Sequence, residues 1–122
     1  MLLIDTSIWI DHFRKQNARL SAALIRGDAL MHAFVLGELA LGHEQRFTEI
    51  SKDLMDLPNA KIASSNEVLR LISRQALAGS GIGYVDAHLV ASALLMPDVR
   101  LWTRDRRLRA VADRLSISAE ME

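Results

Sequence analysis

Short apolar runs alternate with longer segments of helical periodicity along the whole of this chain. We predict strands at residues 2–4, 29–31 and 99–103, with shorter candidates at 61–63 and 116–118. Strands that alternate with helices form a parallel sheet with helices packed on both of its faces. The sequence therefore predicts an α/β fold of three layers, with a central parallel β-sheet between helices.

The segments between these runs carry apolar residues at helical spacing. Ser64 and Glu67 form a capping-box pattern in front of one of them. Residues 84–96 are apolar on most sides, which is typical of a helix at the centre of a fold. We predict helices at 8–14, 17–26, 34–41, 48–57, 68–76 and 84–96, and a last helix that is capped by Asp105.

Length and composition limit the possible functions. The chain has 122 residues, which is enough for a single domain over residues 1–122 and too few for a second. Its 15 basic and 15 acidic residues cancel, so a nucleic-acid partner has to be argued from local charge. The absence of cysteine excludes disulfides and thiolate metal sites. Because no apolar run reaches the length of a signal peptide or a membrane span, we expect a cytoplasmic protein with no membrane partner.

Four acidic residues share one relation to the predicted strands. Asp5 ends the first strand, and Asp105 follows the last one directly. Glu38 lies in the helix after the second strand, and Asp86 lies in the first turn of the apolar helix. Ligands of parallel α/β folds bind beyond the carboxyl ends of the strands. We therefore expect the four acids to meet at one end of the sheet.

Each acid also has a structural explanation, which is favoured when three of them are taken singly. Asp5 and Asp105 stand where aspartate commonly caps helices, and Asp86 complements the positive end of a helix dipole. Glu38 is different, because it lies among apolar residues and an acid is rarely buried without a partner. The four acids taken together favour a functional site.

Four neighbouring carboxylates repel one another unless some are protonated or a cation binds. A donor set made only of oxygen suits Mg²⁺ or Mn²⁺, which bind one or two carboxylates, several waters and a substrate phosphate. Such an ion lowers the pKa of water and stabilises charge on a phosphodiester. The acids therefore predict metal-assisted phosphodiester hydrolysis.

Hydroxyl side chains at Thr6, Ser7 and Thr103 adjoin these acids. Two roles are equally open for them. They either orient the carboxylates or cap helices.

Arginines cluster around Asp105 in the sequence. Six of the twelve lie between residues 100 and 114, namely Arg100, Arg104, Arg106, Arg107, Arg109 and Arg114. Arginine makes two-pronged phosphate contacts, and such contacts supply most of the affinity for nucleic acid. We interpret Arg104, Arg106 and Arg107 as nucleic-acid-binding residues, with a solvated helix face as the alternative.

Other common chemistries find no support in the residue pattern. The four histidines, at 12, 32, 43 and 88, lack the spacing of a zinc site, so we interpret them as structural or surface residues. No nucleophile–base pair or glycine-rich phosphate loop is visible. A receiver-like phosphoacceptor domain also clusters acids, but it requires a lysine after its last strand. The lysines here, at 15, 52 and 61, do not fit that position.

Four motifs in this chain resemble those of PIN-domain ribonucleases of the VapC type, the toxin half of VapBC toxin–antitoxin pairs. They are DTSIWID at 5–11, ELALG at 38–42, IGYVDAHLVASA at 82–93 and LWTRDRRL at 101–108. The motifs stand in the family's order and span nearly the whole chain. The segment 45–63 carries nothing diagnostic.

The resemblance implies a PIN fold and a Mg²⁺-dependent endoribonuclease, with Mn²⁺ able to substitute. It implies that Asp5 and Asp86 are direct metal ligands and that Glu38 and Asp105 act through water. It also implies an RNA substrate, a homodimer, and a VapB-type antitoxin that neutralises the toxin in a hetero-oligomer. Trp9, Ile10 and Phe13 either contribute to a groove for that partner or pack in the core.

One further hypothesis stays open, a PIN-like module that binds RNA or protein without cutting. The complete set of four acids argues against it, because a binding module has no need to hold mutually repelling charges together.

Overall fold

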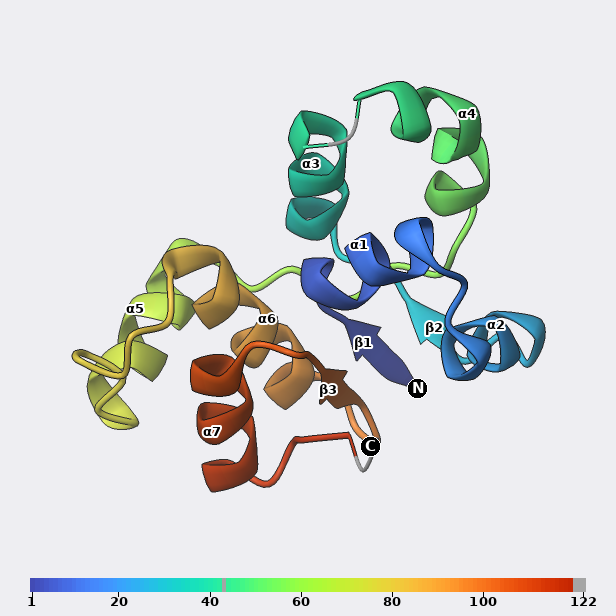
Figure 1. Cartoon of the computed structure of the whole chain (residues 1–122). Helices are drawn as coiled ribbons and strands as arrows, with labels where there is room; N and C mark the ends of the chain where they lie inside the picture. The colour runs from blue at the N-terminus through green and yellow to red at the C-terminus, as the bar shows by residue number, and fades with distance from the viewer. Residues whose placement is uncertain (43, 120–122) are drawn as a thin grey trace.

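Three parallel strands form the centre of the computed structural model, which describes residues 1–42 and 44–119 (Figure 1). The strands are β1 (Leu2–Ile4), β2 (Ala29–Leu30) and β3 (Arg100–Trp102), in the order β2-β1-β3. Leu3 of the central strand pairs with Leu30 on one side and with Leu101 on the other. The carboxyl ends of all three strands therefore lie at one edge of the sheet, as the sequence predicts.

Single bridges extend the sheet at both edges. Met31 pairs with Asn59, and Leu101 pairs with Ser118, each in parallel orientation. The second bridge lies within the edge strand predicted at 116–118, of which the structure has only this single pairing at Ser118. The prediction of a strand at 61–63 is wrong, because the chain pairs with the sheet earlier, through the carbonyl of Pro58 and the N–H of Ala60.

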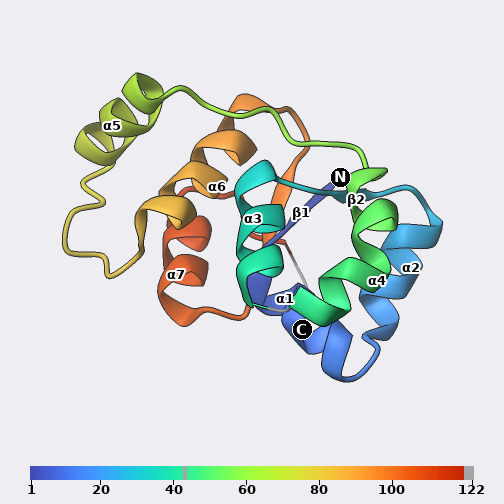
Figure 2. The same ribbon diagram turned by 90° about the horizontal axis from the view of Figure 1, so that it is seen from above.

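Seven helices are present in the described part of the chain. The helix at 44–55 begins four residues earlier than predicted. The helices are α1 (Thr6–Arg14), α2 (Ala18–Ile25), α3 (Ala33–Gly42), α4 (Glu44–Met55), α5 (Ser65–Arg74), α6 (Tyr84–Leu95) and α7 (Arg106–Arg114). In both views α5, α6 and α7 gather at one end of the molecule, and α2 and α4 lie at the other (Figures 1 and 2). The helices flank the parallel sheet, so the predicted α/β class is confirmed.

Helix α6 lies at the centre of the fold. Every residue from 87 to 93 is buried, and the helix packs on β3 and on α5. This explains why its sequence is apolar on most sides. The start of α5 is fixed by the predicted capping box, in which the Ser64 hydroxyl accepts from the Glu67 N–H and the Glu67 carboxylate accepts from the Ser64 N–H.

The apolar residues of α1 belong to the core. Trp9 is fully buried, and Ile10 and Phe13 pack against the same cluster. The core interpretation of these three residues is therefore the one that the structure supports. None of the helices in the described residues is both long and apolar enough to cross a bilayer.

Candidate active site

Asp5 stands at the point where β1 meets α1. It occupies the N-cap position of α1, and its backbone carbonyl accepts from the N–H groups of Ile8 and Trp9. Its carboxylate takes no part in capping the helix. The structural explanation offered for Asp5, a side-chain cap, is therefore wrong. The buried carboxylate, only 6% exposed, is available for another task.

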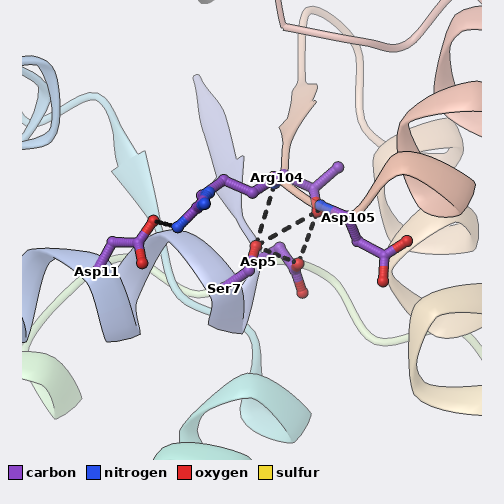
Figure 3. Close-up of polar contacts among 6 residues, drawn as sticks. Asp5, Ser7, Asp11, Arg104 and Asp105 are labelled. Atoms are coloured by element: carbon purple, nitrogen blue, oxygen red, sulfur yellow. Dashed lines mark hydrogen bonds and ion pairs between the residues drawn. The ribbon is translucent and has the colours of Figure 1, made fainter.

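Two hydroxyl groups hold the Asp5 carboxylate instead. Ser7 Oγ donates to Asp5 Oδ2 at 2.8 Å, and Thr103 Oγ1 donates to the same oxygen at 2.7 Å. Thr103 follows β3, so these bonds tie the ends of two neighbouring strands together (Figure 3). Thr103 Oγ1 also accepts from the backbone N–H of Asp105 at 3.0 Å. Of the two roles left open for these hydroxyls, the structure supports the orientation of carboxylates.

Glu38 projects from α3 toward the first turn of α1. Thr6 Oγ1 donates to Glu38 Oε1 at 2.7 Å. The side chain is exposed, which differs from the expectation of a buried acid that needs a partner. The difference arises because α3 buries Val35 and Leu39 and leaves the Glu38 side of the helix open to solvent. Glu38 and Asp5 thus each receive a hydroxyl from the start of α1.

Asp86 lies in the first turn of α6, after the glycine-rich loop 79–83. Its Oδ2 accepts from the backbone N–H of Gly83 at 3.1 Å. Burial raises the pKa of the Asp86 carboxyl, and the Gly83 N–H acts in the opposite direction. The negative charges of Asp5, Asp105 and Glu38 raise the pKa of Asp86 further. The structure thus brings the four acids from four separate segments within electrostatic reach of one another.

Asp105 is a helix cap as well as a member of this group. Its Oδ1 accepts from the N–H groups of Arg107 and Leu108 at 2.9 and 3.0 Å, at the start of α7. The side chain is exposed and points away from Arg104 (Figure 3). The structural explanation for Asp105 is therefore correct, and the cap also fixes where its charge lies.

The four acids fit a hard divalent cation by chemistry, since their donors are all oxygen. Among the described residues, no three acidic or histidine side chains converge closely enough to form a ready-made metal cage. Magnesium does not require one, because it keeps several waters and is commonly bound by one or two carboxylates. The neighbouring negative charges that raise the pKa of Asp86 are the charges that a bound cation would neutralise.

The three predicted nucleic-acid-binding arginines have three different environments. The Arg104 side chain reaches across to Asp11 on α1 and forms an ion pair with it (Figure 3). The backbone N–H of Arg104 donates to Ser7 Oγ at 3.1 Å. Arg106 is exposed and lines a cleft between α1 and α7. Arg107 lies against Gly81, and a Cβ added there would meet Arg107 Cδ at 2.6 Å.

Sequence reasoning missed Asp11 and Gly81 as residues of this region. Asp11 falls within a quoted motif, and its place on α1 gave no indication that it meets Arg104. Gly81 has a φ of +86°, which favours glycine over any other residue. The glycine-rich composition of 79–83 is a signal for such a conformation, but the contact with Arg107 depends on tertiary structure.

The described histidines are structural, as expected. His32 Nδ1 accepts from the Phe34 N–H at 3.0 Å at the start of α3, and its Nε2 lies 3.0 Å from Ser92 Oγ. His88 is buried against the rings of Phe34 and Tyr84. His43 lies outside the described residues.

Comparisons with known proteins agree with this geometry. A family model described as PIN domain matches residues 2–114. The chain is 44% identical over 110 residues to ribonuclease VapC32 of Mycobacterium tuberculosis, in two strains, across 90% of this chain and 89% of that protein. The fold is similar to the crystal structure of FitAcB from Neisseria gonorrhoeae, with a TM-score of 0.66 and 21% identity over 93% of this chain and 94% of that one.

Proposed function

The chain belongs to the PIN-domain family as a VapC-type member, and on that premise we propose that it is a metal-dependent endoribonuclease toxin. It cuts phosphodiester bonds of RNA at the site formed by Asp5, Glu38, Asp86 and Asp105. The ribonuclease activity in the name of the VapC32 relative supports the reaction type.

The arrangement of the acids is the observation that carries this proposal. The Asp5 carboxylate is buried and held by Ser7 and Thr103, and Thr6 beside it holds Glu38. The pKa of Asp86 is raised by burial and by the charges of the three other acids, which agrees with this arrangement. A structural role does not require such an arrangement, since a helix cap needs one carboxylate and not four. A site that has to bind a divalent cation does require concentrated negative charge.

Each polar residue of the site has a definite task in the proposed reaction. Asp5 and Asp86 would hold the cation, and Ser7 and Thr103 keep the Asp5 carboxylate in place. Glu38, oriented by Thr6, and Asp105, oriented by its cap to α7, accept hydrogen bonds from water and orient it toward the phosphodiester. The chemistry that Mg²⁺ or Mn²⁺ supplies there is a lower pKa for water and stabilisation of developing phosphate charge.

Cleavage of total cellular RNA by the purified chain tests the proposal. The assay is run with Mg²⁺, with Mn²⁺ and with chelator, and we expect cutting only with metal. Asp5→Asn, which removes the charge of a carboxylate held through Oδ2 by two hydroxyls, should lower the rate by roughly 100-fold or more. Arg70→Gln, an exposed change on α5, is the matched control and should cut at the wild-type rate.

A folded, metal-loaded chain that binds several RNA pools and cuts none would contradict the proposal. That outcome would support the alternative, a PIN-like module that binds RNA or protein without cleavage. Circular dichroism of Asp5→Asn separates loss of activity from loss of fold.

We also propose a VapB-type antitoxin and a homodimer as partners of this chain, on the basis of the VapC resemblance. Large apolar side chains remain exposed on several helices, including Leu41 at 91%, Met55 at 61% and Leu69 at 56%. These side chains lie on different helices and mark no single interface, so the proposal of both partners rests on the resemblance. Size-exclusion chromatography with light scattering, with and without the product of an adjacent small gene, measures both assemblies.

A further inference from the structure

A cleft of about 500 Å³ opens beside the acidic site, between α1 and the first turns of α7. Buried Ile8 and Trp102 contribute its apolar lining. Arg104, Arg106 and Arg109 contribute its cationic side chains. Its volume lies in the range of pockets that hold small ligands, and it is open to solvent as a segment of a longer polymer requires.

The cleft lies next to the acidic site, although none of the four acids lines it. Thr103 lines the cleft, and its hydroxyl donates to Asp5 Oδ2 at 2.7 Å. Arg104 follows Thr103, and its backbone N–H donates to Ser7 Oγ, which holds the same carboxylate. A polymer that places one phosphodiester at Asp5 therefore has this cleft close by for a neighbouring residue.

The charges of the cleft differ from those of the acidic site. Two of its arginines face acids, since Arg104 pairs with Asp11 and Arg109 Nε lies 3.7 Å from Asp113 Oδ1. In the described part of the chain Arg106 has no ion-pair partner. The lining thus carries three positive and two negative side chains, whereas the adjoining site carries four negative ones.

We propose that this cleft binds the nucleotide next to the scissile bond, with Arg106 and Arg104 in contact with its phosphate. The inference rests on the proposed function, because it takes RNA as the substrate. Arginine is suited to two-pronged phosphate contact. Asp11 also lines the cleft, and its carboxylate is a hydrogen-bond acceptor, which a ribose hydroxyl can use and a phosphate cannot.

This mixture of groups favours a nucleotide over an acidic peptide. An acidic side chain of a peptide makes use of the arginines, but its carboxylate has no hydroxyl to donate to Asp11. A nucleotide presents an anion together with neutral donors, and it therefore matches both kinds of side chain.

Binding of a short fluorescein-labelled single-stranded RNA, followed by anisotropy in chelator, tests the proposal without cleavage. Arg106→Gln should weaken binding about 5- to 10-fold and reduce the slope of log Kd against log salt by about 1. Arg104→Gln should weaken binding to a similar degree. Arg70→Gln removes the same charge from an exposed site on α5 and should stay within about twofold of wild type.

Asp11→Asn gives a result of opposite sign. It removes the carboxylate that competes with phosphate for Arg104, so we expect tighter RNA binding. Equal losses in Arg106→Gln and Arg70→Gln, or wild-type affinity in both Arg106→Gln and Arg104→Gln, would overturn the proposal. So would a loss in Arg106→Gln confined to an oligoglutamate peptide. Far-UV circular dichroism confirms that these exposed variants are folded.

The two proposals fail in different ways. If the wild-type chain cuts no RNA with metal while Arg106→Gln still weakens RNA binding in chelator, the proposal for the cleft is supported and the proposed ribonuclease activity is contradicted. If the wild-type chain cuts RNA while the Arg106→Gln and Arg104→Gln variants bind RNA with wild-type affinity, the proposed ribonuclease activity is supported and the proposal for the cleft is contradicted.

Discussion

At the scale of single residues, the acids of the site differ in how the fold uses their charge. The carboxylate of Asp105 caps α7, so its negative charge is favourable to the metal-free fold. The carboxylate of Asp86 is half-buried and faces three other acids, so its charge is unfavourable. Because the charge of Asp86 destabilises the metal-free protein, the stability of the fold does not explain why this position carries an acid.

Asp86→Asn should therefore stabilise the metal-free protein at neutral pH. Asparagine keeps an oxygen for the Gly83 N–H and removes the charge that burial and the neighbouring acids oppose. After allowance for solvent screening, the gain should be on the order of 1 kcal/mol or less, or a few degrees in Tm. Thermal melts in chelator measure it.

The pH dependence gives this prediction its sign. Because the folded state raises the pKa of Asp86 above its ordinary value of 3.8, the native protein binds the proton more tightly than the unfolded chain. The wild-type protein therefore loses stability as pH rises through that range, and the gain in Asp86→Asn should disappear below pH 3.8. Added Mg²⁺ should stabilise wild type more than the variant. A variant that melts below wild type in chelator at neutral pH would contradict the account.

The sequence predicts the positions of these residues better than their contacts. Position after a strand or at a helix start is a local property, and it was enough to bring Asp5, Asp86 and Asp105 to one edge of the sheet. The exposure of Glu38 and the Arg104–Asp11 pair depend on how α1, α3 and α7 pack. Such contacts join residues about 30 to 90 positions apart, and no local pattern encodes them.

At the scale of elements, the loop 79–83 and the first turn of α7 form one unit that carries Asp86 and Asp105. Arg107 lies where a side chain at Gly81 would be, so the loop and the helix pack through the glycine. The prediction of a strand at 61–63 is wrong because this segment, too, is placed by a tertiary contact. Its apolar residue Ala63 packs with Val68 and Ala87 in a second cluster of the core and not in the sheet.

Gly81→Ala should destabilise the protein through two separable effects. Alanine at a φ of +86° costs roughly 1–2 kcal/mol, and the exposed Arg107 side chain has to move away from the added Cβ at a smaller cost, about 0.5 kcal/mol. In an Arg107→Ala background the collision is absent and the conformational cost remains. Urea unfolding of the four members of this cycle measures the coupling free energy, expected to be about 0.5 kcal/mol.

Gly79→Ala is the matched control for this cycle. Gly79 has a similar φ of +81°, and a Cβ added there meets no atom within 4 Å. It should therefore show the conformational cost and no coupling to Arg107→Ala. Equal coupling at Gly79 and Gly81 would show that the contact with Arg107 is not the cause.

At the scale of the whole molecule, a buried histidine joins the two parts of the fold that carry Glu38 and Asp86. His32 caps α3 through the Phe34 N–H, and its other ring nitrogen meets Ser92 on α6. Burial and, to a smaller degree, the charge of the neighbouring His88 together lower the pKa of His32 to about 4. The native state therefore holds this imidazole neutral where the unfolded chain protonates it.

The free energy of unfolding should accordingly fall as pH drops from about 6.5 to about 4. A histidine whose folded pKa is depressed gives stability that is present above its unfolded pKa and lost as pH decreases toward the folded one. His32→Asn keeps an acceptor for the Phe34 N–H and cannot be protonated. At pH above 6.5 it should be less stable than wild type by roughly 1–3 kcal/mol, because Ser92 loses a buried partner.

Towards pH 4 that difference should shrink, since wild type loses stability on acidification and the variant loses less. Urea midpoints at a series of pH values measure both slopes. Part of the slope should remain in the variant, because burial lowers the pKa of His88 as well. Parallel slopes in wild type and variant would mean that His32 does not set the acid limit. Stabilities that converge towards pH 4 would mean that the neutral imidazole, which joins α3 to α6, sets the acid limit of the fold.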